Sequence, residues 1–188
     1  MPLLAVRGNG PASAYGFGAL SGKAAAMTAI ATTSVSSNVT SVTFSSIPGT
    51  YDDLRLVAYW NVDTAGGTLG IQFNSVTTSS YYFQILSGNG STASVNRGTA
   101  NALYVDSLNG AGTSPMIQTV DVFQYASTST NKPVIMELAS DANGSGLRNI
   151  AIGSWASNNA ITSIKLTLSD YNIISGSVFA LYGIKKAS

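Results

Sequence analysis

The chain has 188 residues, no cysteine, no histidine and a net charge of +1. It therefore has no disulfide framework and no thiolate nucleophile, and it lacks the commonest general base and metal ligand. Charged residues make up only 9% of the chain and the basic ones are scattered, which argues against a nucleic-acid partner. No apolar run reaches the roughly 18 residues of a membrane helix, so no membrane partner is expected.

Residues 1–22 differ in composition from everything that follows. Glycine and proline interrupt them so often that neither a helical nor a strand period survives. They nevertheless contain more apolar residues than a solvated linker would: Leu3, Leu4, Val6, Tyr15 and Phe17. We expect residues 1–22 to be an extended assembly arm and residues 23–188 to form one domain. The alternative is that residues 1–22 form a flexible tail with no role in assembly.

Short segments of alternating apolar and polar residues, separated by turn residues, fill the rest of the chain. This pattern indicates β-strands, and no segment has a helical period. It predicts an all-β protein, a jelly-roll-like antiparallel β-sandwich of about ten strands. We expect loops at Gly88–Arg97 and Asn109–Ser114. The expected strands cover residues 25–35, 42–47, 53–62, 69–73, 80–86, 102–108, 115–125, 133–139, 147–155, 164–168 and 175–186.

The last expected strand, residues 175–186, is apolar on both faces. Side chains alternate along a strand, so Val178, Tyr182 and Ile184 point one way and Phe179 and Leu181 the other. A strand on the surface of a lone domain should alternate apolar with polar residues. We therefore expect one face to meet the core and the other a neighbouring subunit, and all five residues are candidates for an oligomer interface.

Two groups of polar residues suggest chemistry, but each has a simpler explanation. Asp121 and Glu137 lie on strands that could be neighbours, as the paired carboxylates of a glycosidase would, but a solvated or subunit-facing strand surface explains them better. Asp141, Asn143 and Ser145 match the start of a calcium loop. The position that should hold a bidentate glutamate is Ile152, so a turn explains this stretch better. We therefore expect no catalytic residue, no metal and no cofactor.

Tyrosines near strand ends or loops are the remaining candidates for ligand contact. Tyrosine rings stack on sugars, although they also suit cores and subunit interfaces. Tyr104, together with the two expected loops, is the candidate for contact with a glycan.

Three stretches resemble a group of virion structural proteins from tailed bacteriophages, of cyanophage or marine-phage type. Val42–Val57, with Ile47, Pro48 and Tyr51, resembles the opening strand, turn and strand of that group. Ile71–Asn74, followed by the pair Tyr81 and Tyr82, resembles its next strand pair, and Gly176–Lys185 resembles its closing strand. The resemblance covers about residues 39–186, and residues 12–18 are similar to the leaders of phage fibre proteins.

The resemblance implies a β-sandwich that assembles on a particle, usually as a trimer, and it implies no catalytic residues. The chain is thus expected to be a non-enzymatic accessory protein of the virion that decorates or cements the capsid or forms part of a short fibre. Its expected partners are its own copies and a major capsid protein or a tail protein. The alternative is a fibre module that binds a glycan on the host surface. A depolymerase is disfavoured, because the chain has no β-helix repeat.

Overall fold

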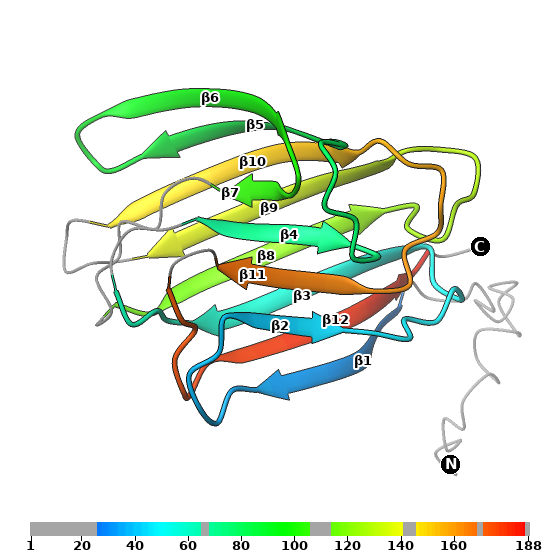
Figure 1. Cartoon of the computed structure of the whole chain (residues 1–188), viewed down its shortest axis with the longest axis horizontal. Coiled ribbons are helices and arrows are strands. Elements are labelled where there is room, and N and C mark those ends of the chain that lie inside the picture. The colour runs from blue at the N-terminus through cyan, green and yellow to red at the C-terminus, as the bar shows by residue number, and fades with distance from the viewer. Residues whose placement is uncertain (1–25, 65–67, 106–113, 141–145, 169–170, 187–188) are drawn as a thin grey trace, which may run out of the picture.

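The computed structural model describes residues 26–64, 68–105, 114–140, 146–168 and 171–186. These residues form two antiparallel β-sheets and no helix (Figure 1). The prediction of an all-β sandwich is therefore confirmed. The described part of the chain contains no helix long and apolar enough to cross a membrane.

Eight strands form the larger sheet, in which every neighbouring pair is antiparallel. Its spatial order is β1 (Ala26–Ser34), β12 (Val178–Lys185), β3 (Asp53–Trp60), β8 (Met116–Phe123), β9 (Lys132–Ser140), β10 (Leu147–Trp155), β5 (Tyr81–Gly88) and β6 (Ala93–Ala100). The strands β1 and β6 are its two edges.

The smaller sheet has four strands and packs against one face of the larger sheet (Figure 1). Its order is β2 (Ser41–Phe44), β11 (Ile164–Leu168), β4 (Leu69–Phe73) and β7 (Leu103–Val105). From β2 onward the chain passes repeatedly from one sheet to the other. This alternation is consistent with a jelly roll, which stays a prediction.

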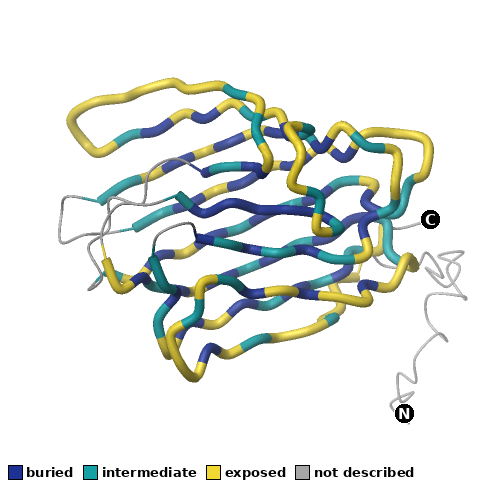
Figure 2. The backbone as a smooth tube through the Cα atoms, viewed as in Figure 1, coloured by how far each residue is buried: buried dark blue, intermediate teal, exposed yellow. Residues whose placement is uncertain are grey.

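Buried and exposed residues alternate along most strands of the large sheet (Figure 2). Because successive side chains point to opposite faces of a strand, the buried ones form the core between the two sheets. Trp60 packs against Phe179 with ring centroids 6.2 Å apart, and Trp155 stacks on Tyr81 at the same distance. The hydroxyl of Tyr81 accepts a hydrogen bond from the backbone N–H of Phe73 at 2.9 Å. Burial raises the pKa of Tyr81.

Two stretches far apart in the sequence meet at one end of the core. Tyr51 lies directly over Gly183 of β12, where an added Cβ would be 2.2 Å from the tyrosine ring. The hydroxyl of Tyr125 donates a hydrogen bond to the carbonyl of Pro48 and accepts one from the backbone N–H of Tyr51. The turn after β2 is thereby fixed to the last strand and to the segment after β8.

The described residues form twelve strands where about ten were expected for the chain, and one expected boundary is corrected in particular. Most of the stretch expected to be the loop Gly88–Arg97 belongs to β5 and β6, and the turn between them is short. Among the described strands, β6 pairs with β5 alone, and it is exposed along most of its length. An edge strand that buries neither face has no apolar period, which is why the pattern did not predict it.

Candidate assembly surface

The outer face of the eight-stranded sheet, which points away from the core, is unusually apolar. The strongly exposed large hydrophobic residues of the described chain all lie on this face, and we call them the apolar face: Met27, Tyr59, Tyr82, Leu86, Val95, Ile117, Ile135, Ile150, Ile152 and Val178. Such residues scattered singly over a surface need no explanation, but a group gathered on one face marks an interaction site.

The register of the strands assembles these residues into rows across the sheet. One row runs from Val178 through Tyr59 to Ile117, and another from Ile150 through Leu86 to Val95. Followed across the sheet, the first row continues into Arg148 and the second into Glu137. The apolar face is therefore spread over the sheet as far as the edge strand β6, and it forms only through strand order and register, so that no single segment of the sequence contains it.

The charged residues near the middle of this face are paired with one another. Arg55 donates two hydrogen bonds to Asp121, from Nε to Oδ1 at 2.6 Å and from Nη2 to Oδ2 at 2.8 Å. This pairing raises the pKa of Arg55. Arg148 lies 3.6 Å from Glu137, between Nη2 and Oε2. The middle of the face thus carries charges but little net charge.

Asp121 and Glu137 do lie on neighbouring strands, as the sequence suggested, because β8 pairs with β9. Each of the two carboxylates faces an arginine. Among the described residues, histidine, cysteine, aspartate and glutamate form no group of three or more that could hold a metal ion.

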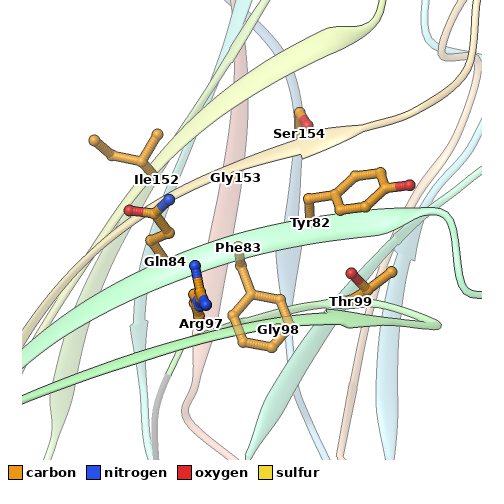
Figure 3. Close-up of a pocket in the computed structure, with 9 residues that line it drawn as sticks. All are labelled: Tyr82, Phe83, Gln84, Arg97, Gly98, Thr99, Ile152, Gly153 and Ser154. Carbon is orange, nitrogen blue, oxygen red and sulfur yellow. The ribbon is translucent and has the colours of Figure 1, made fainter.

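A hollow of about 640 Å³ lies on the same face, across β6, β5 and β10. Figure 3 shows Gln84, Arg97 and Ile152 on one side of the strands, with the ring of Phe83 directed the other way beside Gly98. Tyr82 lies farther along β5 and is half exposed. The described residues that line the hollow include no carboxylate. It combines apolar surface with one guanidinium and one amide, which suits contact with another protein surface.

The outer face of the small sheet has a contrasting character. A groove of about 400 Å³ is lined there by Gly70, Ala102 and a set of uncharged polar side chains, Thr68, Gln72, Asn101, Tyr104 and Thr167. The hydroxyl of Tyr104 donates to Oδ1 of Asn101 at 2.7 Å, and Gln72 Nε2 donates to the carbonyl of Asn101 at 3.1 Å. The ring of Tyr104 meets Phe83 edge-on, with centroids 5.8 Å apart, so it is held in place.

The structure divides the residues expected at an oligomer interface into two groups. Val178, Tyr182 and Ile184 are directed outward, on the same side as the apolar face. Phe179 and Leu181 are completely buried in the chain's own core, so their assignment to an interface is wrong. The alternation along the strand was predicted, but one of its two faces is already covered by the small sheet.

Other expected site residues lie outside the described part of the chain. The arm residues Leu3, Leu4, Val6, Tyr15 and Phe17 belong to the stretch 1–25, and the loop residues Asp141, Asn143 and Ser145 to 141–145. Both assignments stay predictions. Tyr104 lies on the short strand β7, within the stretch 102–108 that was expected to form a strand, and its contact with a glycan stays a prediction.

Sequence reasoning missed most of the apolar face, although a signal was present. The strand β8 carries Ile117 on its outer side as well as Val120 and Val122 on its inner side, and β10 carries Ile150 and Ile152 opposite buried Ala151. Apolar residues on both sides of a strand indicate that both of its faces are covered. The predicted oligomer interface rests on this pattern in the last strand alone, so it omits the outward residues of β8 and β10.

A comparison with protein-family models, curated proteins and solved structures finds no match to this chain.

Proposed function

We propose that this chain is a non-enzymatic structural subunit that assembles with copies of itself through the apolar face. One observation carries the proposal, namely that the strongly exposed large hydrophobic residues of the described chain gather on the outer side of a single sheet. Burial of such surface is the main favourable term in protein association.

The resemblance to tailed-phage virion proteins supports a specific setting for this assembly. We propose that the particle is a virion, in which the chain serves as an accessory protein that decorates the capsid or forms part of a short fibre. The small fraction of charged residues and the absence of cysteine and histidine fit a subunit whose surface is largely engaged by neighbours.

The proposal is tested by placing charges on the apolar face. The double variant Ile117→Lys with Ile152→Lys alters two side chains that are 56% and 63% exposed, so the fold should tolerate it. Sedimentation should show the unmodified chain as an oligomer at micromolar concentration and the variant as a monomer.

A matched control places two lysines on the opposite side of the molecule. Ser41 and Thr43 lie on the outer side of β2, and Ser41→Lys with Thr43→Lys should leave the oligomer intact. An unmodified chain that stays monomeric throughout would contradict the proposal.

A second function, binding of a neutral glycan, is favoured by the groove around Tyr104. The described side chains that line it offer hydroxyl and amide groups and no charge, which suits a ligand rich in hydroxyls. Titration with neutral oligosaccharides should perturb the NMR signals of Gln72, Asn101 and Thr167, and Tyr104→Ala should abolish the response. Tyr82→Ala, which removes an exposed tyrosine on the other face, is the control. Binding that survives Tyr104→Ala would exclude this groove.

A further inference from the structure

Resting on the proposed self-assembly, we infer that the apolar face binds the same face of a second copy across a two-fold axis. The assembling unit is then a face-to-face dimer of eight-stranded sheets. This arrangement differs from the trimer that the phage resemblance implies.

The described surface offers one apolar face and not two different ones. A ring of three copies is held by a heterologous interface, in which one surface patch meets a different patch on the next copy. Among the described residues, the strongly exposed large hydrophobic side chains occupy the outer face of the large sheet alone. The outer side of the small sheet presents Thr43, Lys165 and Thr167 instead. The apolar complement to this face on the described surface is therefore the same face of another copy.

The outer side of the large sheet is wide enough to hold a second copy. Strands spaced by about 4.8 Å give a sheet of eight a width of roughly 35–40 Å, and a rise of about 3.3 Å per residue gives eight-residue strands a length of roughly 26 Å. The outer side of the sheet, on which the apolar face lies, therefore covers roughly 900 Å² per copy. A stable specific interface buries about 800 Å² per partner, so stacking even most of this face suffices for a dimer.

The charges on the outer side of the sheet are compatible with a second copy of the same face. A face that carries several like charges would repel its own copy, and burying an unpaired charge is strongly unfavourable. Here Arg55 is bound to Asp121 and Arg148 lies beside Glu137 within each copy. Arg97 lies on the edge strand β6, at the rim where solvent still reaches a stacked pair. Two copies can thus approach without new like-charge contacts at the centre.

The dimer has a definite geometry that can be probed. Stacked sheets lie about 10 Å apart with their strand directions within about 30° of each other. Thr119 is in the middle of β8, which is one of the two central strands of the sheet, and its side chain is directed outward. In a face-to-face dimer the two copies of Thr119 lie close to the axis and to each other.

The experiment uses the absence of cysteine, which makes any introduced cysteine the only thiol in the chain. Sedimentation of the full-length unmodified chain first establishes its stoichiometry. Thr119→Cys is then treated with a short bis-maleimide cross-linker, and Val57→Cys, opposite Thr119 on the adjacent strand β3, repeats the measurement at a second central position. Thr43→Cys on the small sheet is the control.

We expect a dimer by sedimentation, a covalent dimer as the main product from the two central cysteines, and none from Thr43→Cys. A trimer would overturn this inference and leave the proposed self-assembly standing. A dimer that does not cross-link at either central position would also overturn it, because pairing through the edge strand β1 would then explain the association. A monomer would overturn both the inference and the proposed function.

Discussion

Gly183 has no side chain because a tyrosine ring occupies the place where one would be. A Cβ built at this position would lie 2.2 to 2.5 Å from three atoms of the Tyr51 ring. Gly183→Ala must therefore displace Tyr51, whose backbone N–H is bound to the Tyr125 hydroxyl. We expect overpacking to lower the free energy of unfolding by about 1–3 kcal/mol, measured by denaturant titration.

Gly49→Ala is the matched control for this substitution. It lies in the same turn region before Tyr51, and an added Cβ would meet nothing within 4 Å. Its free energy of unfolding should stay within about 0.5 kcal/mol of the unmodified chain. Equal losses in the two variants would contradict the role of the Tyr51 contact.

Gln118 is a buried polar side chain whose replacement should stabilise the protein. It is completely buried on the inner side of β8, and neither of its amide atoms has a hydrogen-bond partner among the described residues. Leaving such groups unpaired costs about 1–3 kcal/mol, so Gln118→Met should raise the free energy of unfolding by about 1 kcal/mol.

Gln72 provides the comparison, because it is also buried but hydrogen-bonded. Its Nε2 donates to the carbonyl of Asn101, and Gln72→Met removes that bond. Calorimetry should therefore show opposite shifts of the melting temperature for the two glutamine-to-methionine changes. Destabilisation in both would indicate that Gln118 is satisfied by an ordered water molecule.

The two sides of strand β12 have different roles. Its inner side packs in the core, and its outer side lies on the apolar face that is proposed to bind a second copy. Phe179 is buried against Trp60, so Phe179→Ala should lower the free energy of unfolding by about 3–5 kcal/mol. Val178, its neighbour in sequence, is 36% exposed on the apolar face. Val178→Thr should leave the stability of a single chain within about 0.5 kcal/mol and weaken only the association.

Denaturation at several protein concentrations distinguishes these two effects. The loss in Phe179→Ala should be the same at every concentration, whereas the loss in Val178→Thr should grow as the concentration rises. A loss in Val178→Thr that does not depend on concentration would mean that Val178 contributes to the core.

Strands that bury one face could be predicted from the sequence, whereas an exposed edge strand could not. The strand β11 begins and ends at the predicted residues 164 and 168, because its buried and half-buried positions alternate strictly. The strand β6 was missed, because its stability comes from backbone pairing with β5 and not from side-chain burial. An edge strand of this kind is specified by its partner, which a local pattern does not contain.

The apolar face could likewise be predicted only in part, because a local sequence pattern does not contain the neighbouring strands. The outward residues of β12 were predicted from their own strand. The rest of the apolar face was not, because Ile117, Leu86 and Ile152 come to lie on one face only through the order β8, β9, β10, β5 of the sheet. The contrast between an apolar large sheet and a polar small sheet is likewise a property of the assembled sandwich.

A face-to-face dimer makes the stability of the whole molecule depend on its concentration. Association stabilises the folded state and not the unfolded chain, so each tenfold rise in concentration adds about 1.4 kcal/mol per dimer, or half of that per chain. For a chain of this size the melting temperature should rise by roughly 2 °C per tenfold increase. Calorimetry over two decades of concentration should show this slope for the unmodified chain and none for Ile117→Lys with Ile152→Lys. A melting temperature that is constant for the unmodified chain would mean that the apolar face stays free of a second copy.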